Sequence, residues 1–161
     1  MRIAVCPGSF DPITKGHLDI IKRASLLFDK VIVVVLQNPA KTTTFTAQER
    51  VDFIRRATAQ LPNVEADSFD GLLVNYMERV GAIAIVKGLR AVSDFEYEFQ
   101  MSLTNRRLNP DIDTVFLNTA QEYLYLSSSM VKQIAAFGGE IKDFIPEPIF
   151  EDINNRLQKG T

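Results

Sequence analysis

Short apolar runs alternate along the chain with segments whose apolar residues repeat at helical spacing. The runs that we expect to form strands are Ile3–Cys6, Val31–Leu36, Val64–Phe69, Ala82–Val86 and Thr114–Leu117. The first, second and fourth runs are apolar at every position, which is typical of parallel strands that helices cover on both faces. The pattern therefore predicts a parallel sheet.

Five helices are expected beside these strands. Their apolar positions are Leu18, Ile21, Ala24 and Phe28; Val51, Ile54, Ala57 and Leu61; Phe95, Phe99 and Leu103; Val131, Ile134 and Ala135; and Ile149, Ile153 and Leu157. We expect Gly138-Gly139 to end the fourth helix and Pro148 to begin the last one. Strands and helices in alternation predict a doubly wound α/β sheet with right-handed crossovers.

Composition sets the number of domains and excludes several classes of protein. The chain has 161 residues, 46% of them hydrophobic, and a formal net charge of −2. This length, without a linker, low-complexity stretch or internal repeat, predicts one domain over residues 1–161. The single cysteine excludes an intramolecular disulfide and a multi-cysteine zinc site.

Nothing in the chain indicates a membrane or nucleic-acid partner. The longest strongly apolar run, Val31–Leu36, is too short to span a bilayer. The start, Met1-Arg2 and a brief apolar stretch, lacks a signal-peptide pattern, so we expect a cytoplasmic protein. Lysines and arginines are scattered in ones and twos, which disfavours binding to nucleic acid.

Chemistry-bearing residues gather in the segments that follow the strands. These segments are Pro7–His17, Asn38–Lys41, Lys87–Arg90 and Tyr123–Ser129, and they hold hydroxyls, small residues, cations and the sole histidine. Loops at the carboxyl ends of parallel strands form the ligand crevice of such a sheet. The four segments together therefore predict a phosphate-rich ligand.

The first of these segments can be interpreted in two ways. Thr14 could simply cap the following helix, which we expect to begin at about Gly16-His17. Alternatively, the free N–H groups of that helix start could bind an anion, with His17 donating a hydrogen bond to a phosphate. A helix start would lower the pKa of His17 and favour its neutral form.

The other candidate residues also have structural alternatives. One serine of Ser127–Ser129 is expected to cap a helix, while its neighbours could hold a second phosphate. Lys41 alone resembles a surface lysine, and Asp94, Glu96 and Glu98 resemble a solvated acidic face opposite Phe95, Phe99 and Leu103. Cys6 is expected to be a small buried hydrophobic residue.

Several common nucleotide and metal motifs are absent from the sequence. There is no Gly-x-x-x-x-Gly-Lys loop, and no Gly-x-Gly-x-x-Gly follows a strand. No residues have metal-ligand spacing either, so no metal ligand from the protein is predicted. We therefore expect a Mg²⁺ ion, if used, to be held mainly by substrate phosphates.

A family resemblance joins these segments. Gly8-Ser9-Phe10-Asp11-Pro12 with Thr14-Lys15-Gly16-His17 resembles the nucleotidyltransferase superfamily marked by Thr/His-x-Gly-His. Gly88-Leu89-Arg90-Ala91, Asp94-Phe95-Glu96-Tyr97-Glu98, Asn105-Arg106 and Ser127-Ser128-Ser129 extend the match over nearly the whole chain. Together they are similar to the bacterial phosphopantetheine adenylyltransferases.

The resemblance implies a fold, a reaction and partners. The fold would be a Rossmann-like, five-stranded parallel sheet in a homohexamer. The reaction would transfer the adenylyl group of ATP to 4′-phosphopantetheine, giving 3′-dephospho-coenzyme A and pyrophosphate, the penultimate step of coenzyme A synthesis. It would depend on Mg²⁺, and coenzyme A would inhibit it by feedback.

The resemblance also implies roles for individual residues. Ser9 would contact both substrates, and His17 would bind ATP and stabilise the transition state, with Lys41 and Arg90 as further catalytic cations. The phosphopantetheine site would comprise Ser9, Lys41, Leu73 and Lys87. The ATP site would comprise Ser9, Phe10, His17, Gly88, Leu89, Arg90, Glu98, Tyr123, Leu124, Tyr125, Leu126, Ser127, Ser128 and Ser129.

The sequence departs from the family pattern at three places. Position 87 is lysine where the family has arginine, which replaces a planar clamp by a point charge. Ser9 stands where many relatives have threonine, and Leu124–Leu126 replaces an aromatic-rich stretch. The alternative functions are another transferase of the superfamily, acting on nicotinamide mononucleotide or making a CDP-alcohol, and a non-catalytic nucleotide-binding module.

Overall fold

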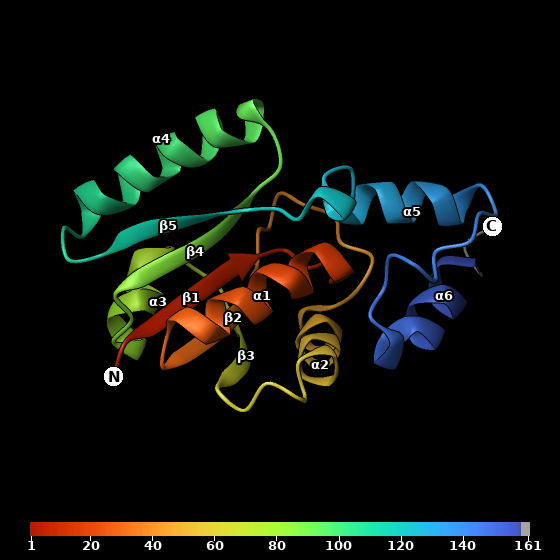
Figure 1. The fold of residues 1–161 in the computed structure, drawn as a ribbon, viewed down its shortest axis with the longest axis horizontal. Coiled ribbons are helices and arrows are strands. Elements are labelled where there is room, and N and C mark those ends of the chain that lie inside the picture. The colour runs from red at the N-terminus through yellow and green to blue at the C-terminus, as the bar shows by residue number, and fades with distance from the viewer. Residues whose placement is uncertain (159–161) are drawn as a thin grey trace.

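The computed structural model describes residues 1–158, without the side chains of residues 92 and 93. Its centre is a five-stranded sheet in the order β3-β2-β1-β4-β5, in which every neighbouring pair is parallel (Figure 1). The strands are β1 (Ile3–Gly8), β2 (Lys30–Leu36), β3 (Val64–Phe69), β4 (Ala84–Leu89) and β5 (Asp113–Asn118). The predicted Rossmann-like, doubly wound α/β sheet is thus confirmed.

Helices follow the strands in alternation. They are α1 (Lys15–Leu27), α2 (Ala47–Ala57), α3 (Leu73–Val80), α4 (Val92–Leu108), α5 (Ser128–Ala136) and α6 (Phe150–Gln158). Among these, α3 is missing from the sequence prediction. Its start carries no capping side chain, whereas Gly81 ends it in the left-handed conformation at φ 67°, a signal that could have indicated it.

The ends of several elements differ from the prediction. β4 begins at Ala84 instead of Ala82 and continues to Leu89, so Lys87 and Gly88 lie in a strand and not in the loop expected for them. The last helix begins at Phe150, because Pro148 belongs to a short 3₁₀ turn, Glu147–Ile149. The expected stop at Gly138 is confirmed, since α5 ends at Ala136 and Gly138 has a φ of 77°.

The sheet separates two apolar cores. On one face, alternate residues of the strands pack against α1, α2, α5 and α6; on the other, they pack against α3. Val33 and Val5, from neighbouring strands, represent the two faces, and both side chains are fully buried. None of the helices among residues 1–158 is long and apolar enough to cross a membrane.

Helix α4 leaves its apolar positions largely exposed. The side chains of Phe95, Phe99 and Leu103 are 42%, 46% and 54% exposed. Phe95 and Phe99 stack on each other with ring centroids 5.5 Å apart, and Phe95 also contacts Phe116 of β5. Figure 1 shows why they stay exposed, because α4 lies along the β4–β5 edge with no further layer outside it.

Candidate active site

A pocket of about 260 Å³ opens at the carboxyl ends of β1 and β4. These strands are neighbours in the sheet, yet β1 is followed along the chain by β2 on its other side. The strand order therefore reverses at this point, where ligands bind in doubly wound folds. The lining residues are Cys6, Pro7, Gly8, Phe10, Thr14, Gly16, His17, Ile20, Ile21, Val86, Lys87, Gly88, Arg90, Asp94, Glu98, Thr119, Tyr123, Leu126, Ser127 and Ser128.

The loop after β1 has an unusual backbone at Phe10. Its φ of 48° lies in the left-handed region, which side-chain-bearing residues seldom adopt and which is often found at functional sites. The conformation turns the ring inward, where it meets the imidazole of His17 edge-on with centroids 5.1 Å apart. Gly8 permits this approach, because a Cβ there would lie 3.0 Å from the Phe10 ring. The loop thus shapes one wall of the pocket around His17.

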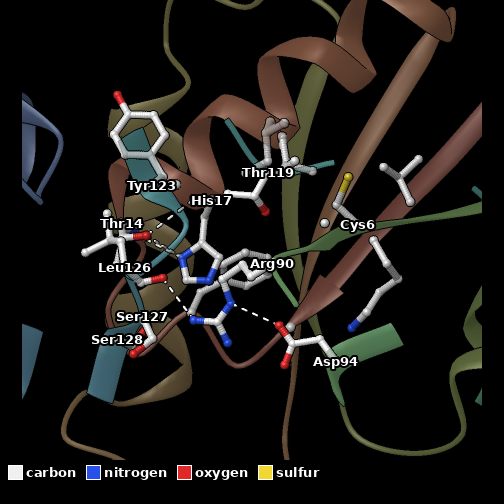
Figure 2. Close-up of a pocket in the computed structure, with 18 of the residues that line it drawn as sticks. Cys6, Thr14, His17, Arg90, Asp94, Thr119, Tyr123, Leu126, Ser127 and Ser128 are labelled. Atoms are coloured by element: carbon white, nitrogen blue, oxygen red, sulfur yellow. Dashed lines mark hydrogen bonds and ion pairs between the residues drawn. The ribbon is translucent and has the colours of Figure 1, made fainter. Parts of the chain in front are cut away.

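His17 is held by the cap of its own helix. Thr14 caps α1 by accepting a hydrogen bond from the His17 N–H, and the Thr14 N–H donates to His17 Nδ1 at 3.0 Å. Because Nδ1 accepts, a neutral ring carries its proton on Nε2. The expected cap is thus confirmed, and it leaves the Nε2 side of His17 to the pocket, so capping does not exclude the proposed contact with a phosphate (Figure 2).

Burial and neighbouring charges keep His17 neutral. Burial of the ring, followed by the positive charges of Arg90 and Lys87, lowers the pKa of His17 from 6.5 to about 4. The direction agrees with the sequence prediction, but the cause there was the helix start, and here it is burial and two cations. At neutral pH the ring is therefore a hydrogen-bond donor without charge.

The cations of the pocket are paired with carboxylates from α4. Lys87 Nζ lies 3.3 Å from Glu98 Oε1, and Arg90 Nε lies 3.3 Å from Asp94 Oδ2. Arg90 also donates to the carbonyl of Leu126 at 3.0 Å, which aligns its guanidinium beneath His17 (Figure 2). The pocket thus holds two cations whose carboxylate partners lie on a single helix.

The expected solvated acidic face is therefore wrong for two of its three members. Glu96 is exposed, but Asp94 and Glu98 line the pocket. The wrong assignment has a physical cause: Asp94 and Glu98 lie one helical turn apart on the side of α4 that faces the pocket cations, whereas Glu96 lies on another side. The resemblance, which places Glu98 in the ATP site, agrees with its position in the pocket.

The start of α5 completes the opposite wall. Ser127 caps the helix by accepting from the Met130 N–H at 3.1 Å, as expected for one serine of the three. Ser128 donates to the carbonyl of Pro12 at 2.7 Å, which ties α5 to the loop after β1. Ser129 is exposed and does not line the pocket.

The pocket gathers most of the predicted residues but not all of them. It brings together Phe10, His17, Lys87, Gly88, Arg90, Glu98, Tyr123, Leu126, Ser127 and Ser128. The predicted residues outside its lining are Ser9, Lys41, Leu73, Leu89, Leu124, Tyr125 and Ser129. Lys41 is exposed in the segment after β2, whereas the carbonyl of Ser9 accepts from Arg50 Nη1 at 2.8 Å.

Sequence reasoning missed the apolar floor and one polar residue of the pocket, Thr119. Ile20 and Cys6 lie at the floor; Cys6 is buried as expected, and burial raises the pKa of its thiol to about 12. Gly88 lets the Ile20 side chain approach β4, because a Cβ there would lie 2.8 Å from Ile20 Cγ1. Thr119 follows β5 directly, and that place at a strand end could have indicated it.

The arrangement can bind and stabilise phosphates. A neutral imidazole donor, two cations and a helix start face one cavity, and each of these groups favours a phosphate oxygen. The lining offers no activated nucleophile: the thiol of Cys6 stays protonated, and the Thr14 hydroxyl, 3.2 Å from His17 Nδ1, is occupied in capping α1. The chemistry that fits is transfer between phosphates bound in the pocket.

Comparison with known proteins identifies the family. Residues 5–134 match the cytidylyltransferase-like family. The chain is 57% identical over 160 residues to the phosphopantetheine adenylyltransferase of Caldanaerobacter subterraneus subsp. tengcongensis, covering 99% of this chain and 100% of that protein. It is 60% identical over 153 residues to that of Clostridium tetani, covering 95% and 96%.

A solved structure shares the fold at low sequence identity. It is a bifunctional NMN adenylyltransferase/ADP ribose pyrophosphatase of Francisella tularensis, 18% identical with a TM-score of 0.72, covering 98% of this chain and 49% of that one. Family match, full-length relatives and fold agree with the pocket chemistry. The chain belongs to the cytidylyltransferase-like family, among the phosphopantetheine adenylyltransferases.

Proposed function

We propose that the protein transfers the adenylyl group of ATP to 4′-phosphopantetheine, releasing pyrophosphate and forming 3′-dephospho-coenzyme A. The observation that carries the proposal is the neutral His17 facing Arg90 and Lys87 in one pocket. Relatives of nearly full length that bear the phosphopantetheine adenylyltransferase name support the choice of acceptor.

The reaction needs no base and no covalent intermediate. The second pKa of a phosphate monoester is about 6, so the acceptor is mostly dianionic at neutral pH and attacks directly. An oxygen of that phosphate forms a bond to the α-phosphorus of ATP, and the bond from this phosphorus to the bridging oxygen breaks as pyrophosphate leaves. Positioning and charge neutralisation then supply most of the catalysis.

The imidazole, cations and serines of the pocket have places in this displacement, together with three predicted residues outside its lining. His17 donates from Nε2 to the α-phosphoryl oxygens, where negative charge is redistributed in the transition state. Arg90 and the serines at the start of α5 hold the departing pyrophosphate. Lys87 and Lys41 orient the acceptor phosphate, with Ser9 between the two substrates and Leu73 beside the pantetheine arm.

In this proposal Mg²⁺ is bound mainly by the phosphates of ATP. Among residues 1–158, no group of three or more His, Cys, Asp or Glu side chains could hold a metal ion. The pocket carboxylates Asp94 and Glu98 are each paired with a cation. The residues therefore do not build a metal cage, and the expected dependence on Mg²⁺ is tested by removing it with EDTA and restoring it.

The exposed apolar side of α4 supports a homohexamer. Contiguous exposed apolar residues on one helix are typical of a surface that another protein surface covers. Coenzyme A carries both the pantetheine arm and the adenylyl group of the product, so we propose that it inhibits from the same pocket. We also propose a cytoplasmic location.

Pyrophosphate release tests the reaction. Protein with ATP and Mg²⁺ is offered 4′-phosphopantetheine or nicotinamide mononucleotide in separate assays, and the product mass is determined. Release only with phosphopantetheine, with dephospho-coenzyme A as product, supports the proposal. Release only with nicotinamide mononucleotide favours the other transferase, and ATP binding without release favours the binding module.

A further inference from the structure

We infer that Asp11 is a positioning residue, which with Lys132 clamps together the three segments that carry the two halves of the active site. The inference rests on the proposed transfer reaction, and it concerns residues outside the lining of the pocket. Three observations support it: the burial of Asp11, the number of its partners, and the places in the chain from which those partners come.

Asp11 is a buried carboxylate whose two oxygens are both engaged. Its side chain is 7% exposed. Oδ1 accepts from the Phe45 N–H at 2.9 Å, and Oδ2 accepts from the Thr44 N–H at 2.9 Å and from Lys132 Nζ at 2.9 Å. Such a group is strongly destabilising if its partners are lost, because an unpaired charge would remain buried.

The charge of Asp11 is retained at neutral pH despite this burial. Burial alone would raise the pKa of the carboxyl group. The hydrogen bonds from Thr44, Lys132 and Phe45 outweigh burial and bring the pKa below its ordinary value. The clamp is therefore ionic under working conditions, with Arg50 as a further nearby cation.

The partners of Asp11 lie on segments with different tasks. Asp11 itself belongs to the loop between Ser9 and His17. Thr44 and Phe45 end the segment after β2, which carries Lys41, and Lys132 lies on the second turn of α5, whose first residues face the pocket. One carboxylate thus joins the acceptor side of the site, the His17 side and the pyrophosphate side.

A second contact supports the same function. The buried Arg50 of α2 donates from Nη1 to the carbonyl of Ser9 at 2.8 Å and from Nε to the carbonyl of Thr46 at 3.3 Å. Ser9 and Asp11 are therefore both fastened to the stretch from Thr44 to Arg50. In-line transfer between two bound substrates depends on such relative placement, since a misplacement of about 1 Å can cost roughly 100-fold in rate.

If Asp11 and Lys132 form such a clamp, their substitution should lower kcat much more than it weakens substrate binding. Each substrate contacts its own side of the site, so loss of the clamp should leave binding of either one nearly intact. The joint geometry should suffer, which lowers kcat. In Asp11→Asn the amide NH₂ would face the donors of Thr44 and Lys132, while Lys132→Met removes only the cation and leaves Asp11 its two backbone N–H partners.

The experiment compares these two variants with Asn63→Ala. Asn63 donates to the carbonyls of Ser25 and Phe28 near the amino ends of β2 and β3, whereas the pocket lies at the carboxyl ends of the strands, so its loss lowers stability without touching the pocket. We expect kcat to fall about 100-fold in Asp11→Asn and about tenfold in Lys132→Met, with ATP dissociation constants within about threefold of wild type. Asn63→Ala should keep kcat while its thermal midpoint falls.

Amide hydrogen exchange gives a readout that does not depend on activity. Peptides covering residues 38–46 should exchange at least about tenfold faster in both clamp variants and unchanged in Asn63→Ala, because the Thr44 and Phe45 N–H groups lose their acceptor or its anchor. Unchanged exchange, an equal fall of kcat in Asn63→Ala, or a loss of ATP binding proportional to kcat would each overturn the clamp. If Asp11→Asn fails to fold, the exchange, kcat and ATP binding of Lys132→Met test the clamp instead.

The outcomes separate the clamp from the reaction. Wild-type protein that releases no pyrophosphate with phosphopantetheine contradicts the proposed function. The exchange of residues 38–46 in Lys132→Met then decides whether Asp11 fixes this segment at all. Wild-type turnover with unaltered clamp variants contradicts the clamp alone.

Discussion

Helices α1 and α4 begin at equivalent places and have opposite surroundings. Each follows a central strand, β1 or β4, and each contributes residues to the pocket. α1 is capped by Thr14 and buries Ile20, Ile21 and Ala24 in the core. α4 is the longest helix described, has no side-chain cap, and leaves Phe95 and Phe99 exposed. The start of α1 is thus fixed by contacts within this chain, whereas α4 is covered on one side only.

The difference shows what holds the catalytic groups. His17 is aligned by its own cap and by the ring of Phe10, so its geometry is complete within this chain. Asp94 and Glu98 depend on how α4 is rotated over the sheet, which their own ion pairs and the contact of Phe95 with Phe116 constrain from one side only. A neighbouring chain covering the exposed face of α4 would fix it.

The largest effect is expected at the start of α1. His17→Ala removes the Nε2–H donor to the α-phosphoryl oxygens, and loss of one such donor lowers kcat by about 100- to 1,000-fold. Binding of ATP should change far less, because the contact forms mainly in the transition state. Steady-state kinetics and ATP titration measure the two quantities. Weaker binding with unchanged kcat would contradict this function of His17.

The sequence alone identified His17 as a candidate site residue, because its residue type and its position in the fold both indicate a ligand site. His17, Arg90 and Ser127 are unusual residue types at strand ends and helix starts, where parallel sheets bind ligands. Strands could also be predicted from the sequence: the predicted strand Val64–Phe69 has the same ends as β3. Local pattern suffices for features that depend on neighbours in the chain.

Other features depend on contacts that no local pattern encodes. The spacing of Phe95, Phe99 and Leu103 predicted a helix, which α4 confirms, but it could not predict that these side chains stay exposed. What covers a helix face depends on the packing of other elements. For the same reason the residue pattern alone placed Asp94 and Glu98 in solvent, although the family resemblance placed Glu98 in the ATP site, and Ile20 was missed as a pocket residue.

A second, smaller effect is expected at the contact between β4 and α4. Lys87→Ala removes a cation proposed to orient the acceptor phosphate and should raise KM for 4′-phosphopantetheine roughly tenfold. Glu98→Gln is the matched variant, because it breaks the same 3.3 Å ion pair while keeping the cation. That variant should affect KM for ATP instead. An effect of Lys87→Ala confined to ATP would reverse the assignment.

Altering the exposed face of α4 should dissociate the proposed hexamer, which would lower the particle mass by at most sixfold. Phe99→Asp places a charge at the centre of the apolar side and should reduce the proposed hexamer to smaller species, because a buried unpaired charge is costly. Glu96→Ser, on the exposed polar side of the same helix, is the control. Light scattering measures both variants. A Phe99→Asp protein with the wild-type mass would exclude this face from the interface.

The smallest effect is expected in the pH dependence. His17 has a pKa of about 4 in the folded protein against 6.5 as its ordinary value, so it stays neutral from about pH 5 upward and should add no inflection to the pH profile of kcat there. The acid limb near pH 6 should belong to the acceptor phosphate. An acceptor analogue with a lower phosphate pKa should therefore shift that limb, whereas substitution of His17 should not.

The protonation of His17, which should not affect kcat above about pH 5, should be detectable in the pH dependence of thermal stability. Because the pKa of His17 is lower in the folded than in the unfolded chain, the unfolded chain binds the proton first as the pH falls. The stabilisation is complete above pH 6.5 and is lost progressively between about 6.5 and 4. Thermal unfolding of wild type and of His17→Gln should therefore converge over this interval. A constant difference would mean that folding leaves the pKa of His17 near its ordinary 6.5, so that a fraction of the donors would be charged at neutral pH.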